Sequence, residues 1–304
     1  EVLLRHCRLE EILVLDMTEL AFEGVLTTSA ITIATKSREG TETFRLTEAR
    51  LADTGVERRD VAELCADRAP VEAAWTSLLP SRSEEIKRLT RGRTAKLGDY
   101  ARIRRGIASG DNSFFCLTQA EVEKWRIEPE FLVPVVVGAR DLPREGPLTE
   151  DHWRQRLRDG ARGWLLWCHA ARDELEGTNV LRYIEHGERL GLHKRFNCRT
   201  RDPWYGVERV GVPDFFVTYM SRENARFVAN EAGARCMTSL LNLWIADGID
   251  STELTEALGE EDLPRLLRAF GRTYGGGLGK IEPNTLRELP VRPIARRETR
   301  LRAA

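Results

Sequence analysis

The chain has 304 residues, of which 41% are hydrophobic and 31% are charged, a composition typical of a globular protein with one large domain or two smaller ones. Its 47 basic and 48 acidic residues give a net charge of −1, which excludes a polycation that binds its partners by bulk charge. No apolar run approaches the roughly 18 residues of a membrane span, and no N-terminal stretch resembles a signal peptide, so we expect no membrane partner.

The first 50 residues predict a small sheet that follows the end of a helix at residues 1–8. A strand is expected at Glu11–Asp16, and the β-branched stretch Val25–Thr35 gives a stronger strand signal. Thr41–Leu46 is expected to continue the sheet after a turn. Because three strands alone are marginally stable, this segment is expected to be part of a larger sheet.

Residues 51–95 predict a helical connector. The apolar residues follow a helical pattern at Arg58–Ala66 and again at Ser83–Arg91. Pro70 and Pro80 interrupt the region, as is common between domains. We therefore place a domain boundary within this connector.

A different pattern begins at residue 96. A strand is predicted at Tyr100–Arg104, followed by a polar turn at 105–112 and an apolar strand at Ser113–Leu117. Thr118 and Glu121 have the spacing of a capping box, which predicts the start of a short helix. Glycines in the polar turn permit close approach to another backbone.

The rest of the chain alternates short strands with helices. Asn179–Leu190 has the apolar spacing of an amphipathic helix and is followed by glycine. Asp214–Met220 and Ala225–Asn230 are predicted to form a hairpin. Further elements are predicted at Trp164–Cys168, Ser239–Ala246 and Leu263–Tyr274, with a helical turn that starts at Pro283.

Charge is unevenly distributed along this nearly neutral chain. Basic residues are in excess at 86–110 and 265–304, and acidic residues at 247–262. This asymmetry permits a basic groove, although solvated helix faces would give the same pattern. Residues 193–208 interleave bases with aromatic residues, which suits nucleic-acid contact. The alternative, aromatic rings in the core with arginines reaching outward, is favoured because Pro203 breaks any regular face.

Several chemistries are excluded by absent motifs. The six cysteines are widely spaced and form no C-x-x-C pair, which indicates structural thiols in a reduced, cytoplasmic protein. His193 and Cys198 come closest to a ligand spacing, but without a second pair they predict no metal site. The glycine run after Tyr274 fails as a phosphate loop, because Ile281 stands where serine or threonine is needed.

The order of three stretches resembles the C-terminal part of a TaqI-like adenine-N6 DNA methyltransferase of a restriction–modification system. FEGVLTTSAITIATK, from Phe22, is similar to the last motif and final hairpin of the catalytic domain. Leu97–Leu117 resembles the opening of the target-recognition domain, and Tyr274–Val291 resembles its closing segment. The resemblance implies an α+β chain: strands of a Rossmann-like methyltransferase sheet at 1–50, the connector at 51–95 and a DNA target-recognition domain at 96–304.

Two motifs of that family are missing. The chain contains neither the F-x-G-x-G turn that holds S-adenosylmethionine nor the N-P-P-Y tetrapeptide that acts on the target adenine. We therefore expect this chain to be a fragment that binds no cofactor and has no catalytic residue, while S-adenosylmethionine is implied for the full-length parent. The upstream methyltransferase domain and double-stranded DNA are the expected partners.

The resemblance also implies where DNA would be contacted. Phe22 matches the aromatic residue that packs on the flipped base, although it could equally be a core residue at a strand end. The remaining candidates for phosphate and base-edge contact are Arg104, Arg105, Ser109, Asn112, Lys194, Arg195, Arg199, Arg201, Tyr274, Gly276 and Lys280.

Sequence-specific recognition of duplex DNA is thus the expected function, and two alternatives stay open. A stand-alone DNA-specificity subunit would bind without catalysis, but such subunits carry two recognition halves and this chain shows no internal repeat. An unrelated hydrolase or scaffold would make the basic blocks incidental.

Overall fold

The computed structural model describes residues 2–15, 29–52, 55–67, 78–218, 220–221, 225–274 and 278–296. The chain is a mixture of helices and strands, as the sequence predicted, and it forms two compact units. The first unit contains Glu1–Leu97, Ser221–Ala225 and Gly259–Pro293. The second contains Gly98–Met220, Arg226–Leu258 and Ile294–Ala304.

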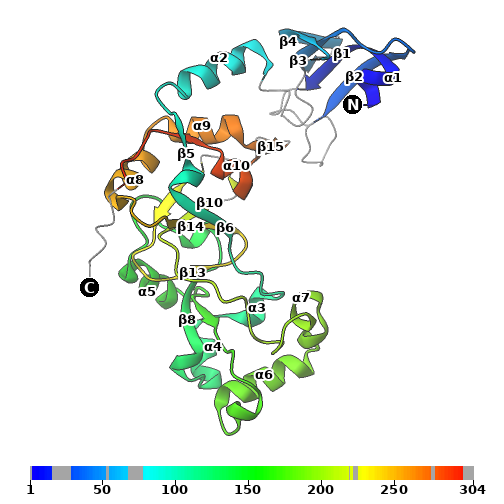
Figure 1. Cartoon of the computed structure of the whole chain (residues 1–304). Coiled ribbons are helices and arrows are strands. Elements are labelled where there is room, and N and C mark those ends of the chain that lie inside the picture. The colour runs from blue at the N-terminus through cyan, green and yellow to red at the C-terminus, as the bar shows by residue number, and fades with distance from the viewer. Residues whose placement is uncertain are drawn as a thin grey trace, which may run out of the picture. The chain divides into compact units, whose positions relative to one another are not determined.

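The first unit begins with a short helix and a sheet and ends with small elements from much later in the chain (Figure 1). Its helices are α1 (Val2–His6), α2 (Pro80–Leu89), α9 (Leu263–Phe270) and α10 (Pro283–Arg287). Its strands are β1 (Cys7–Leu15), β2 (Ala30–Lys36), β3 (Thr43–Ala52), β4 (Gly55–Cys65), β5 (Ala95–Lys96), β15 (Arg272–Tyr274), β16 (Leu278–Lys280) and β17 (Pro290–Val291).

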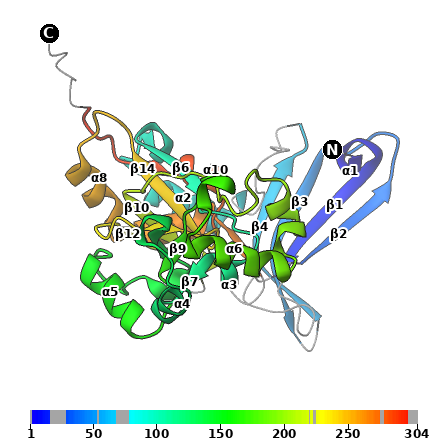
Figure 2. The ribbon, with the colours of Figure 1, turned by 90° about the horizontal axis from the view of Figure 1, so that it is seen from below.

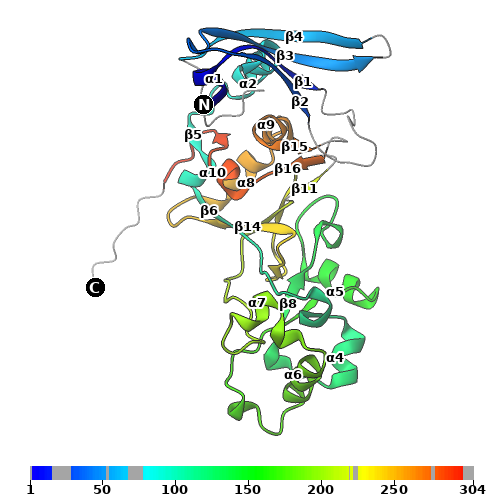
Figure 3. The same ribbon diagram turned by 90° about the vertical axis from the view of Figure 1, so that its right-hand side faces the viewer.

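Strands β1 to β4 form one sheet with the order β2-β1-β3-β4 (Figure 3). β1 and β3 are parallel, whereas the two outer pairs are antiparallel. Leu9, Leu13, Phe44 and Leu46 are buried within it. The strands predicted near Glu11, Val25–Thr35 and Thr41 are confirmed in β1, β2 and β3 where the structure describes them. The candidate base contact Phe22 lies outside the described residues.

The helix predicted at Arg58–Ala66 is wrong, because these residues belong to strand β4. β4 pairs with β3 along almost its whole length, and this pairing overrides the local helical pattern. The pairing places Arg58 against Glu11, a carboxylate that is only 1% exposed. Arg58 donates two hydrogen bonds to Glu11, of 3.1 and 2.9 Å, and Thr47 donates a third of 2.7 Å. The bond from Arg58 outweighs burial and holds the pKa of Glu11 below its usual value.

Gly259–Pro293, near the end of the chain, belongs to the first compact unit. β17 pairs with β5, and Glu260 forms an ion pair with Arg93, whose guanidinium is almost buried. The helix predicted at Leu263–Tyr274 ends at Phe270, after which β15 forms a hairpin with β16. The β17–β5 pairing and the Glu260–Arg93 ion pair join residues more than 160 positions apart and have no local signal in the sequence.

The second unit is built around two small four-stranded sheets (Figure 2). One has the order β12-β10-β14-β6 and the other β13-β8-β9-β7. Their strands are β6 (Ala101–Arg105), β7 (Cys116–Leu117), β8 (Leu132–Val136), β9 (Trp164–Leu166), β10 (Phe215–Thr218), β12 (Phe227–Ala229), β13 (Arg235–Cys236) and β14 (Leu240–Ile245). β11 (Met220–Ser221) lies where the chain passes from one unit to the other.

Helices of the second unit include α3 (Asn112–Phe115), α4 (Gln119–Trp125), α5 (Glu150–Arg158), α6 (Asn179–Arg189), α7 (Phe196–Arg199) and α8 (Ser251–Leu258). The predicted capping box is confirmed: Thr118 Oγ1 accepts a bond of 3.2 Å from the Glu121 amide, and Glu121 accepts one of 2.8 Å from the Thr118 amide. The predicted helix at Asn179–Leu190 and the hairpin of β10 with β12 are also confirmed.

The strand predicted at Ser113–Leu117 is wrong in its first half. Asp111 caps α3 by accepting hydrogen bonds from the backbone amides of Ser113 and Phe114, at 2.8 and 3.2 Å. Because these bonds satisfy free amides at a helix start, they favour one helical turn where the apolar pattern suggested a strand. Only Cys116 and Leu117 form a strand, β7, which pairs with β9.

Gly106 marks a close approach between β6 and the segment before β14. A β-carbon at this position would lie 2.2 Å from the Met237 carbonyl oxygen. No heavy-atom contact can be that short, so an added methyl group must push two backbones apart.

We predict that Gly106→Ala lowers the free energy of unfolding by about 2 kcal/mol or more, as overpacking of a tight core does. Urea denaturation followed by tryptophan fluorescence measures the change. Gly138→Ala is the matched control, because its β-carbon would meet only Ser239 Oγ at an ordinary 3.6 Å. Equal stability of the two variants would contradict the close approach.

Candidate nucleic-acid interface

Two segments that the sequence singled out as basic lie against each other in the second unit. Gly110 has a φ of 89° in the turn after β6, and a β-carbon there would meet Asn197 Cβ and Cys198 Sγ, both at 3.1 Å. The Ser109 carbonyl oxygen accepts a bond from the thiol of buried Cys198, at 3.8 Å. The predicted candidates at 104–112 and 194–201 are therefore neighbours, although more than 80 residues separate them in the chain.

Arg201 holds these two segments together. Its guanidinium donates to three backbone carbonyls: that of Asn197 at 2.6 Å, that of Gly206 at 3.3 Å, and that of Ser109. It also lies 5.3 Å from the centre of the Phe115 ring. Burial lowers the pKa of Arg201 from its usual value. Its donors are occupied inside the protein, so Arg201 positions the interface.

Ser109 has a similar internal role. The side chain is only 2% exposed, and its hydroxyl donates to Asn112 Oδ1 at 2.6 Å. Asn112 itself is exposed at the first turn of α3. Ser109 therefore fixes the orientation of an exposed amide that remains accessible to a ligand.

Asp111 neutralises one of the candidate cations. Besides capping α3, its carboxylate forms an ion pair with Arg195. Burial would raise the pKa of Asp111, but hydrogen bonds from Ser113 and Phe114 and the charge of Arg195 together hold it below its usual value. The ion pair fixes the guanidinium of Arg195, which stays about half exposed.

We name the segment Lys194–Arg199, which includes α7, the basic finger. Lys194 and Arg199 are exposed, and Phe196 is 69% exposed at the tip of the segment. The guanidinium of Arg199 lies 5.4 Å from the centre of the Phe196 ring. The basic finger thus presents cations and one aromatic ring on a base that Arg201 and buried Cys198 hold in place.

Other aromatic residues of the 193–208 stretch enter the core instead. Tyr205 is 2% exposed, and its hydroxyl donates to the Ala170 carbonyl at 2.8 Å. Trp204 is half-buried and donates from Nε1 to Glu188 at 3.2 Å. Trp204 and Tyr205 thus pack inward, as the core interpretation of this stretch predicted, whereas Phe196 faces outward.

Arg104 and Arg105 lie at the end of β6 and are exposed. Arg104 makes an ion pair of 3.3 Å with Glu208, and both side chains are more than half exposed. An exposed pair of this kind contributes little stability, so it can be exchanged for a phosphate at low cost.

The third predicted set belongs to the first unit where the structure describes it. Tyr274 lies in β15 and Lys280 in β16, in the first unit, and Gly276 lies outside the described residues. Lys280 forms an ion pair of 2.7 Å with Glu282. We therefore restrict the candidate interface to the second unit.

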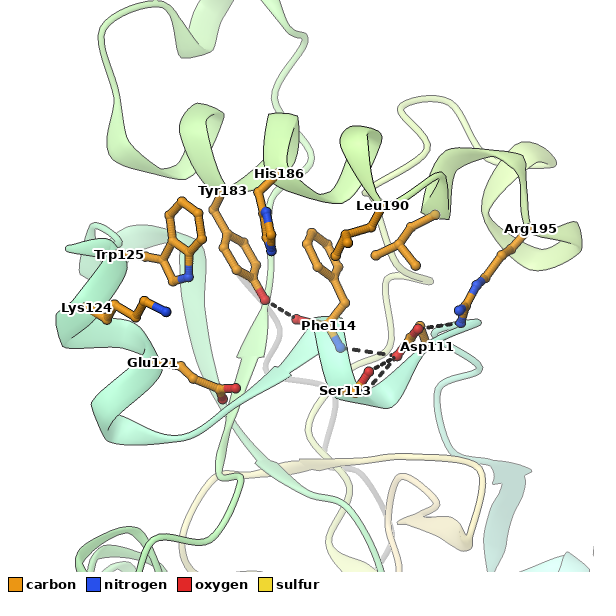
Figure 4. A pocket seen from close by; sticks show the side chains of 11 residues that line it. Asp111, Ser113, Phe114, Glu121, Lys124, Trp125, Tyr183, His186, Leu190 and Arg195 are labelled. Atoms are coloured by element: carbon orange, nitrogen blue, oxygen red, sulfur yellow. Dashed lines mark hydrogen bonds and ion pairs between the residues drawn. The ribbon is translucent and has the colours of Figure 1, made fainter.

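A pocket of about 450 Å³ adjoins the basic finger (Figure 4). Asp111, Ser113 and Arg195 line it together with Trp125 of α4 and Tyr183 and His186 of α6. These aromatic residues belong to no functional motif in the sequence. Both helices were predicted from local signals, but their convergence depends on tertiary packing.

No cluster of histidine, cysteine, aspartate or glutamate capable of holding a metal ion occurs among the residues that the structure describes. The six cysteines are unpaired, and burial raises the pKa of the Cys116 thiol to about 12. Within the same described ranges, no helix is both long enough and apolar enough to cross a membrane.

Comparison with known proteins identifies the family. Residues 72–303 match the family described as type II methyltransferase M.Eco57I, C-terminal domain. The chain belongs to this family. The resemblance to the C-terminal part of a restriction–modification methyltransferase, inferred from the sequence, is thereby confirmed.

Two curated relatives are type II methyltransferases. M.AccI from Acinetobacter calcoaceticus is 28% identical over 191 residues, which cover 62% of this chain and 34% of the relative. M.XamI from Xanthomonas campestris pv. amaranthicola is 23% identical over 290 residues, which cover 91% of this chain and 50% of the relative. The chain thus spans between a third and a half of the length of these relatives.

A solved structure shares the fold. The type IIL restriction-modification enzyme MmeI, determined in complex with DNA, has a TM-score of 0.52 and 11% sequence identity. The match covers 91% of this chain and 34% of the MmeI chain.

We predict that Arg201→Met lowers the free energy of unfolding by about 2 kcal/mol or more, because it leaves buried carbonyls without a donor. Arg199→Met, which removes the same charge from an exposed position, is expected to change it by less than about 0.5 kcal/mol. Urea denaturation of both variants makes the comparison. If Arg201→Met leaves the free energy of unfolding unchanged, the positioning role of Arg201 is contradicted.

Proposed function

We propose that the second unit recognises duplex DNA through the basic finger and the adjoining 104–112 segment. The observation that carries the proposal is a set of exposed cations, Lys194, Arg195 and Arg199, on a segment whose base is fixed by Arg201. Lysine and arginine side chains contact phosphates and set the register of a protein on DNA. A rigid base holds them in one arrangement, which reduces the entropy lost on binding.

We propose that Asn112 and Arg105, rather than the basic finger, recognise the base sequence of the DNA. Asn112 accepts a bond at Oδ1 from Ser109, and within the described part of the chain no hydrogen bond joins its Nδ2 group to another residue. An asparagine amide pairs with the edge of adenine, and an arginine fork pairs with guanine. Both residues lie within the segment that the basic finger contacts.

The comparisons support this proposal at the level of the family. The curated relatives are type II methyltransferases, and the MmeI structure, which shares the fold, is a complex with DNA. For the whole protein we propose adenine-N6 methylation of DNA with S-adenosylmethionine as methyl donor. We assign no step of methyl transfer to this chain, because it lacks both F-x-G-x-G and N-P-P-Y.

We predict that this chain binds a randomised DNA duplex with an affinity that falls steeply with salt concentration. Each phosphate contact contributes about 0.9 to the slope of log affinity against log salt. Lys194→Met and Arg199→Met should therefore each reduce the slope by about 1. Fluorescence anisotropy across a series of salt concentrations measures this slope for each variant.

Arg158→Met is the matched control, because Arg158 is an exposed cation of α5 outside the proposed interface. For this variant, the slope of log affinity against log salt should equal that of the unmodified chain. If all three variants share one slope, or if the unmodified chain does not bind at low salt, the proposal is wrong.

A further inference from the structure

The pocket beside the basic finger has a floor of aromatic rings. Phe114 and Tyr183 are buried and stacked, with ring centres 4.5 Å apart and planes 3° from parallel. Trp125 and His186 are half-buried, and their ring centres lie 4.9 Å apart. The last two rings therefore expose surface on which a planar ligand can stack.

Both acidic residues of the pocket are already occupied. Glu121 accepts bonds of 2.8 and 3.1 Å from Arg162 and further bonds from Thr118. Asp111 accepts bonds from two backbone amides and pairs with Arg195. Hydrogen bonds and the charge of Arg162 together outweigh burial and hold the pKa of Glu121 below its usual value. A cationic ligand would therefore find no free carboxylate.

The cationic groups are more accessible than the acids. Lys124 is exposed, and no hydrogen bond or ion pair links it to another residue in the described part of the chain. Arg195 keeps about half of its side chain exposed while paired with Asp111. The two cations stand on opposite sides of the pocket, with the rings between them (Figure 4).

We propose that this pocket binds one nucleotide unit. Its base would stack on Trp125 and His186, and its single phosphate would meet Lys124, which is next to Trp125 in α4. The volume of about 450 Å³ lies within the range of small-ligand pockets. The unit can be a free nucleoside monophosphate or an unpaired nucleotide of a DNA strand. Only the second source rests on the proposed function.

The first experiment uses free ligands, so it does not depend on duplex binding. We expect deoxyadenosine monophosphate to quench tryptophan fluorescence saturably, whereas inorganic phosphate does not compete at the same concentration. Lys124→Met should weaken binding about tenfold, because a hydrogen bond to a charged group is lost. Arg158→Met should leave it unchanged. Trp125→Leu should also weaken binding, with its unfolding transition checked in parallel.

The second experiment separates the two sources. A duplex with a single unpaired 2-aminopurine is compared with the fully paired duplex by fluorescence and by anisotropy. Tighter binding of the unpaired duplex, with quenching that Lys124→Met reduces, assigns the pocket to a DNA strand. If the monophosphate binds but the unpaired duplex binds no more tightly than the paired duplex, the pocket is assigned to a free nucleotide.

Other results overturn the proposal. Equal competition by inorganic phosphate would show an anion site without base recognition. If neither the monophosphate nor the unpaired duplex responds to Lys124→Met, the pocket does not bind nucleotides. If salt-dependent duplex binding persists in that case, the proposed function stands while this inference fails.

Discussion

The candidate interface depends on a close contact at Gly110, whose φ of 89° favours glycine. Gly110 lies so close to Asn197 and Cys198 that the turn after β6 and the base of the basic finger form a single body. Arg201 then bonds the carbonyls of Asn197 and Gly206 on its own segment and the carbonyl of Ser109 across the contact. A lysine could not do this, because it lacks the planar fork of donors. The exposed cations are thereby held in place by contacts within the protein that would not themselves touch a ligand.

Local signals predicted much of the fold, and nonlocal contacts decided the rest. The helix after Thr118 and the helix α6 could be predicted because capping residues and apolar spacing act within a few residues. Strand β4 was missed because it is specified by pairing with β3 and by the contact of Arg58 with Glu11. The basic residues of the candidate interface were predicted from the sequence, but the sequence could not separate Arg201, which faces inward, from Arg199, which faces outward.

A nearly neutral protein can still present a cationic surface when its acids are used internally. Asp111 and Glu121 both cap helices and pair with arginines, so their charges are cancelled near the backbone. Lys194 and Arg199 stand on the same unit without such neutralisation among the described contacts. Net charge is therefore a poor guide to the local potential here, since the placement of each acid decides which cations remain available.

The return of Gly259–Pro293 to the first unit limits how recombination can exchange the second unit between relatives. The second unit is inserted within the first along the chain, so a recombination event with a single junction near residue 97 would transfer β17 without its partner β5. Exchange of the second unit between relatives requires further junctions, near residues 258 and 293. Under the proposed function, substitutions at positions such as Asn112 alter recognition while the scaffold stays intact.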